Sequence, residues 1–289
     1  MTRDPETGKM TTRTCGNIRD EFRIPRFGFG DSHPRNFVTA QFFRSQFFCA
    51  WTLLWAIFHL LVIALQFYFI DDHPNPKWLS FLTNWGYILL VLFSVVDCAI
   101  TFYVNISKKA LLENDECEIP WYMKIQWVLF NISTVTAVVI TLLFYTLLTP
   151  DMDANSILKH AINSVYALSN LIISAKTVRL LHVYQAVLLS VLYTVFSAIY
   201  QEAGGGTIYE ILDWNKMPNT VLLTIATALI VVPLIHLLCF TIYSIRVFAS
   251  NSCHQTKTVS DVNSAGTTLR NRDVDEKDVG IQNISKDIS

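Results

Sequence analysis

Six long apolar runs occupy most of this chain and limit what it can fold into. They cover roughly residues 47–70, 79–106, 121–149, 157–175, 180–200 and 220–249. Each is near or above the ~20 residues that a helix needs to cross a bilayer core of ~30 Å. In lipid only helices and closed barrels satisfy their backbone groups, and these runs are too long and continuous for barrel strands. We therefore predict an all-α fold, a polytopic bundle of six transmembrane helices.

The distribution of basic residues predicts the orientation of this bundle. If the chain enters from the cytoplasm, 19 of its 22 Lys and Arg residues fall on the inside. Only Lys77, Lys159 and Lys216 then remain outside. Because Lys and Arg concentrate in the cytoplasmic loops of membrane proteins, both termini are expected in the cytoplasm. An even number of spans agrees with that placement.

Composition divides the chain into three parts. Residues 1–46 are a basic and polar cytoplasmic segment. Its Phe and Arg side chains are equally consistent with contact with an anionic inner leaflet and with a disordered arm. Residues 47–249 form the six-span transmembrane domain. Residues 250–289 are rich in Ser, Thr, Asn, Asp and Lys, and we expect them to be a disordered cytoplasmic tail. The chain is predicted to be an integral, multi-pass protein of the plasma membrane or an endomembrane.

Several classes of site are not predicted. No Cys, His or carboxylate group has the spacing of metal ligands, and no nucleotide-binding motif is present. The six cysteines lie on or near the cytoplasmic side, where a reducing compartment disfavours disulfides. We therefore predict no cofactor, no metal and no nucleic-acid partner.

Polar side chains inside the apolar runs are informative because each one is costly in hydrocarbon. In the second run they step along one helical face: Thr83, Tyr87, Ser94, Asp97 and Thr101. In the fourth run a similar face carries His160, Asn163, Asn170 and Ser174. Such stripes serve interhelical hydrogen bonds, worth ~0.6 kcal/mol each on average, or line a wet cavity. A small-solute transporter is a further reading of the same stripes.

Thr83 and His160 lie at a similar depth from the outer face, since both runs start outside. A hydroxyl beside an imidazole is the pattern of a nucleophile and its general base. Asn163 lies one turn further along the same face and would be a donor to an oxyanion. Asp97 is 14 residues beyond Thr83, or ~21 Å along a helix, too distant to orient His160.

Three ordered segments resemble the signatures of the rolling stone family of membrane proteins. They are KWLSFLTNWG at 77–86, KHAIN at 159–163 and IYEILDW at 208–214. The family takes its name from an insect protein implicated in myoblast fusion. The resemblance therefore implies a role in cell–cell fusion or in muscle development. On this hypothesis the outside segments 71–78 and 201–219 meet protein partners or membrane lipid.

A more distant resemblance links the chain to the androgen-induced transmembrane hydrolases, which cleave fatty-acid esters of hydroxy fatty acids. Thr83 and His160 match the Thr and His of that pattern, although Ser80 and Phe81 widen the spacing before the Leu-Thr pair. This resemblance implies an intramembrane lipid esterase as an alternative function. In that reading Thr83 attacks the ester carbonyl and His160 carries the proton. The mouth of the site is formed by Tyr209, Asp213 and Trp214.

Overall fold

The computed structural model describes residues 2–3, 10–11, 21–30, 33–69, 77–113, 117–147 and 157–253. Residues 1–246 form one unit, and residues 247–289 form a second, of which the described part is helical. The long helices of the first unit are α2 (Ser45–Phe69), α3 (Leu82–Ser107), α5 (Trp121–Leu147) and α8 (Val183–Tyr200). A fifth long helix begins with α9 (Asn219–Ala226) and continues through a π turn to Cys253.

Shorter elements join and extend these helices. They are β1 (Thr2–Arg3), β2 (Met10–Thr11), η1 (Ile24–Phe27), η2 (Pro34–Phe37), η3 (Trp78–Ser80), α4 (Ala110–Glu113), α7 (Ile162–Ile173), η5 (Leu180–His182), η7 (Glu210–Leu212) and η8 (Trp214–Lys216), with π turns η4 (Ile157–Ala161), η6 (Gln201–Gly205) and η9 (Thr227–Val231). The two strands pair antiparallel.

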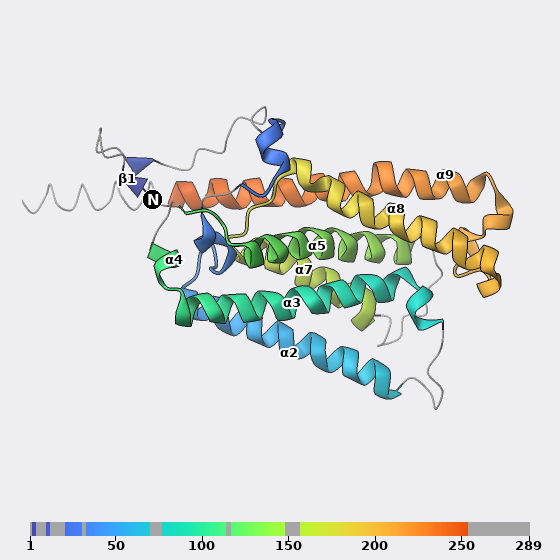
Figure 1. Ribbon diagram of the computed structural model, residues 1–289, viewed down its shortest axis with the longest axis horizontal. Helices are drawn as coiled ribbons and strands as arrows, with labels where there is room; N and C mark the ends of the chain where they lie inside the picture. The colour runs from blue at the N-terminus through green and yellow to red at the C-terminus, as the bar shows by residue number, and fades with distance from the viewer. Residues whose placement is uncertain are drawn as a thin grey trace, which may run out of the picture. The chain divides into compact units, whose positions relative to one another are not determined.

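The helices form a bundle in which successive members run in opposite directions (Figure 1). Helices α2, α5 and α8 run away from the end that holds η1 and η2, and α3, α7 and α9 run back (Figure 1). The charge pattern predicts that the end with 77–81 and 201–218 faces outside, and we call it the outer end. The opposite end is the inner end. The predicted helical bundle is confirmed.

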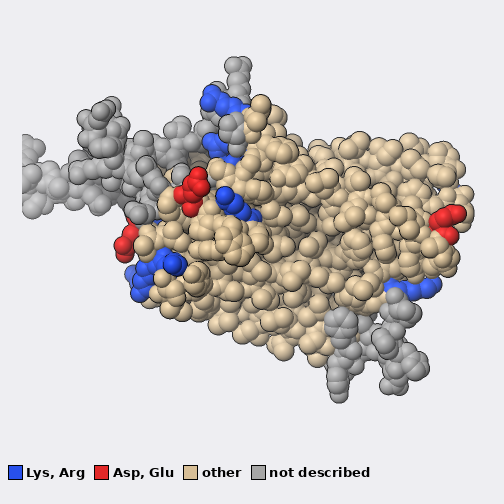
Figure 2. All heavy atoms as spheres, in the orientation of Figure 1, with Lys and Arg blue, Asp and Glu red and all other residues tan. Residues whose placement is uncertain are grey.

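Five helices among the described residues are long and apolar enough to cross a membrane, including Asn219–Cys253. They correspond to five of the six predicted spans. Their outward faces are apolar, with Leu54, Leu192 and Leu229 each about 60% exposed (62%, 58% and 63%). On the face drawn in Figure 2, charged side chains gather towards the two ends and leave a band of uncharged atoms between them. Such a band is what a bilayer core requires.

The fourth predicted span is a shorter helix. The π turn η4 and α7 together cover residues 157–173, and at 1.5 Å per residue they rise ~25 Å. From 174 to 179 the chain is not helical, and Ser174 pairs with Ala40 in an antiparallel bridge. The N–H of Ala175 donates to the carbonyl of Thr39 at 2.9 Å. The N-terminal segment therefore satisfies backbone groups where this helix ends.

The N-terminal segment contributes to the core, although composition suggested an arm outside it. Phe37 and Val38 are fully buried, and the Phe37 ring meets Trp127 of α5 edge-on, with ring centroids 5.1 Å apart. Residues up to 44 thus belong to the same unit as the helices. Helix continues to Cys253, a few residues beyond the predicted start of the tail, and residues 254–289 lie outside the described part.

Candidate functional site

A cavity of about 120 Å³ lies in the outer half of the bundle. Its walls come from the start of α3, the outer half of α5, α8, the loop 206–212 and the first turns of α9. Most of the lining is aliphatic, as with Val139, Ile140 and Leu189. Among the described lining residues none carries a formal charge. An apolar wall with a few polar groups is the usual build of a small-molecule site.

Thr83 brings a hydroxyl to this cavity from the first turn of α3. Tyr209 also lines it and lies within hydrogen-bonding reach of the Thr83 side chain. Burial raises the pKa of Tyr209, while hydrogen bonds to Thr83 oppose that shift. The Tyr209 ring also packs edge-on against Phe81, with centroids 5.7 Å apart. Tyr209 is therefore a neutral hydroxyl at neutral pH, and it lies beside Thr83 at the outer end of the cavity.

His160 and Asn163 lie elsewhere. His160 belongs to the π turn η4, and its ring stacks on Phe144 with centroids 3.5 Å apart. The backbone carbonyl of His160 accepts a hydrogen bond from Thr141. Within the described part of the chain, the cavity lining includes Thr83 and Phe144 but neither His160 nor Asn163. Thr83 therefore faces the cavity while His160 packs behind Phe144, and their catalytic pairing stays a prediction.

Asp213 and Trp214, which the sequence predicts at the mouth of the site, stabilise the loop over the cavity. Asp213 accepts hydrogen bonds from Gln201 Nε2 at 2.9 Å and from the Asn215 N–H at 3.1 Å. The side-chain bond from Gln201 is the main cause that lowers the pKa of Asp213, so the carboxylate stays ionised. Trp214 Nε1 donates to Ser197 Oγ at 3.2 Å. Asp213 and Trp214 thus hold the loop, while Tyr209, Ile211 and Leu212 contact the cavity.

Three π turns occur in these elements, and of the three η9 lies inside a long helix. The turn η4, which carries His160, precedes α7, and η6 ends α8 with Gly204 at a non-helical φ of 84°. Thr227 opens η9 and Val232 follows it, and both line the cavity. Single π turns inside α-helices occur frequently at functional sites. The local geometry thus favours the outer half of the bundle as the functional part.

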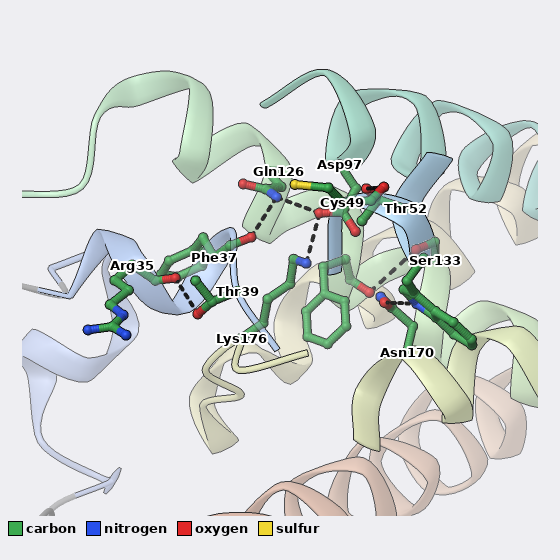
Figure 3. Close-up of polar contacts among 12 residues, drawn as sticks. Arg35, Phe37, Thr39, Cys49, Thr52, Asp97, Gln126, Ser133, Asn170 and Lys176 are labelled. Atoms are coloured by element: carbon green, nitrogen blue, oxygen red, sulfur yellow. Dashed lines mark hydrogen bonds and ion pairs between the residues drawn. The ribbon is translucent and has the colours of Figure 1, made fainter. Parts of the chain in front are cut away.

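A second polar cluster lies buried towards the inner end (Figure 3). Lys176 Nζ and Asp97 Oδ1 are 2.8 Å apart, and both side chains are at most 1% exposed. Gln126 Nε2 donates to the same Asp97 oxygen at 2.6 Å and to the Phe37 carbonyl at 3.0 Å. The Lys176 ammonium also lies 4.7 Å from the centre of the Phe48 ring. This ion pair joins α3 to the segment after α7.

Two arginines bind backbone carbonyls in the same part of the bundle. Arg179 donates to the carbonyls of Gly28 and Gly30, and its guanidinium lies 4.9 Å from the centre of the Trp127 ring. Arg246 donates to the carbonyls of Leu171 and Lys176. A cation near the end of a helix also opposes the partial negative charge of its last carbonyls, as Arg246 does for α7. These bonds fasten the N-terminal segment and the end of α7 to the bundle.

The sequence singles out Asp97 but not its partner, because Lys176 and Arg179 follow the fourth apolar run and are therefore predicted to be charges of a cytoplasmic loop. The signal was present, since an acidic residue within a span calls for a nearby cation. Other stripe residues make interhelical contacts, as Asn170 does by accepting from Trp51 Nε1 at 3.1 Å. Among the described residues no group of three or more His, Cys, Asp or Glu side chains is placed to hold a metal ion.

The structure is that of a multi-pass helical membrane protein. Its helices run in alternating directions, their outward faces are apolar, and an ion pair is buried among them. Comparison with known proteins assigns the family. The family model described as "Protein rolling stone" matches residues 9–259. A Drosophila melanogaster protein named "Protein rolling stone" is 25% identical over 252 residues, covering 80% of this chain and 90% of that protein. The chain belongs to the rolling stone family. No solved structure matches it.

Proposed function

We propose that this chain acts in cell–cell fusion, as in the fusion of myoblasts during muscle development, and that its outer end is the part that acts. The observation that carries the proposal is the ordered loop 206–218. Tyr209, Ile211 and Leu212 of this loop lie over the cavity, while Asp213 and Trp214 hold it in place. Loops that a rigid scaffold positions are where binding residues concentrate. The loop therefore presents a fixed surface to an apposed membrane.

Exposed apolar side chains at the outer end support the same proposal. Met217, in the loop 206–218, is 64% exposed, and Leu79, in η3, is 59% exposed. Trp85 lies nearby, where its Nε1 donates to the Leu79 carbonyl at 2.6 Å. Indole side chains are typical of the membrane–water interface. Apolar side chains beside such a belt suit contact with lipid or with a protein partner at the outer face.

Asp213→Ala is expected to abolish most fusion activity, because the loop loses its bonds from Gln201 and Asn215. The measurement is a cell-mixing assay in fusion-competent cells, with surface amounts of each variant matched by labelling. Glu202→Ala is the control, since Glu202 is exposed in the neighbouring π turn. Full fusion by Asp213→Ala at normal surface levels would contradict the proposed role of the loop.

A second candidate function is lipid-ester hydrolysis. The observation that favours it is the Thr83 hydroxyl at the wall of an apolar cavity, beside Tyr209. In this reading Thr83 is the nucleophile, and His160 becomes its base only if Phe144 moves aside. Asn163 is then the candidate oxyanion donor. A lipid chain in the cavity would hold the ester near Thr83.

Thr83→Ala separates the two candidates in the same cell-mixing assay. If the chain acts in cell–cell fusion without hydrolase chemistry, Thr83→Ala keeps its fusion activity. The methyl and hydroxyl groups that this substitution removes are small parts of the cavity wall. A hydrolase loses its activity entirely, and it also loses labelling by a fluorophosphonate probe. His160→Ala must then abolish the same labelling, since the probe reports a nucleophile that its base activates.

A further inference from the structure

The residues that line the cavity cover a long stretch of α5. They extend from Val135 to Leu147, which is roughly 18 Å at 1.5 Å per residue. One leaflet of a bilayer contributes about half of the ~30 Å hydrocarbon core, or ~15 Å. The lined stretch of α5 therefore matches the acyl chains of one leaflet in length. A volume of about 120 Å³ along this stretch favours one slender chain over a broad, rigid ring system.

The lining changes in character along the cavity. At the deep end it consists of Val135, Ala186 and Val232, whose side chains offer only hydrocarbon. At the outer end Thr83 and Tyr209 add hydroxyl groups. Six other hydroxyl-bearing residues also line the cavity: Thr136, Ser190, Tyr193, Thr194, Thr224 and Thr227. The hydroxyls of Tyr193, Thr194 and Thr224 donate to backbone carbonyls and are therefore already satisfied. An occupant that matches this gradient has an apolar tail in the middle of the membrane and a polar, uncharged group at the outer interface. A charged occupant is disfavoured because the described lining offers no counter-charge.

We infer that the cavity is a binding site for one unbranched acyl chain of a lipid. The chain's methyl end lies between Val135 and Val232, and its carbonyl end lies towards Thr83 and Tyr209. Helices α8 and α9 form part of the cavity wall, and side chains on their outward faces, such as Leu192 and Leu222, are exposed. This binding site goes beyond the role in fusion. It deepens the second candidate, lipid-ester hydrolysis, which would use the same site, while the crosslinking test below reports occupancy and not catalysis.

Photocrosslinking of the full-length chain tests this inference. Membranes would receive either a fatty-acid methyl ester that carries a diazirine near its methyl end and a terminal alkyne, or a phosphatidylcholine with the same acyl chain. Crosslinks are then located by mass spectrometry. The expected result is a concentration of crosslinks on the deep lining, at Val135, Ala186 and Val232. Crosslinks from the phospholipid alone identify a membrane phospholipid as the source, and crosslinks from the methyl ester identify a neutral single-chain lipid.

Ala186→Phe fills the deep end and is expected to reduce these crosslinks on the order of tenfold. Leu188→Phe, two residues away on the exposed face of α8, is the matched control and leaves them unchanged. The mapping on the unaltered chain needs no variant, so a misfolded Ala186→Phe protein does not affect it. Crosslinks confined to outward-facing residues such as Leu188, Leu192 and Leu229 would overturn the inference, whatever the fusion assay shows.

Discussion

Lys176→Met is expected to destabilise the bundle by about 3–5 kcal/mol, because it leaves the Asp97 carboxylate buried without a counter-charge. Lys176 and Asp97 are 2.8 Å apart and almost fully buried. Gln126 still donates one hydrogen bond to Asp97, but an amide does not neutralise a carboxylate. The effect is measured by thermal unfolding of the purified protein in detergent micelles.

The double variant Asp97→Leu/Lys176→Met provides the matched comparison. Replacing both members of a buried ion pair with apolar side chains is often neutral or stabilising. The double variant is therefore expected to unfold close to the wild type, and Lys108→Met, at an exposed position, to have no effect. If Lys176→Met unfolded at the wild-type temperature, the buried pair could not hold α3 and the segment after α7 together.

Arg179→Met is expected to release the N-terminal segment from the bundle. It removes hydrogen bonds from a buried guanidinium to the Gly28 and Gly30 carbonyls, each worth ~1.5–3 kcal/mol because the donor is charged. The measurement is limited trypsin digestion, in which cleavage after Arg23 and Arg26 becomes faster as the segment opens.

Arg35→Met is the control for this digestion, because the Arg35 side chain is exposed while its neighbours are buried. It is expected to leave the cleavage rate after Arg23 and Arg26 unchanged. Equal cleavage rates in Arg179→Met and the wild type would mean that the carbonyl contacts do not hold the segment. The same comparison by thermal unfolding reports how much the segment stabilises the bundle.

The helices could be predicted from the sequence because the signal is local. Apolar runs of sufficient length appear as helices at nearly the predicted positions, as in α2, α3 and α5. The folding of the N-terminal segment could not be predicted, because it depends on contacts far apart in the sequence. Gln126 reaches the Phe37 carbonyl across 89 residues, and no periodic pattern records such a pair.

The relative position of the Thr83 and His160 side chains also could not be predicted from a periodic pattern. Counting regular helical turns from the outer face puts the two residues at one depth. His160 lies in a π turn, which inserts a residue and shifts the direction of side chains relative to a regular helix. Phe144 occupies the place beside the imidazole and faces the cavity. Tyr209 meets Thr83 because of loop bonds that only the three-dimensional structure contains.

The orientation of the bundle is the central claim, since the cavity, the loop and the proposed fusion surface all require an outer end that faces out of the cell or into a lumen. The most direct test is labelling of single cysteines at Lys216→Cys and Lys108→Cys with a membrane-impermeant maleimide, in a chain whose six native cysteines are all replaced by Ser. For protein at the cell surface, the account predicts that Lys216→Cys reacts on intact cells and Lys108→Cys reacts only after permeabilisation. The reverse pattern would contradict it.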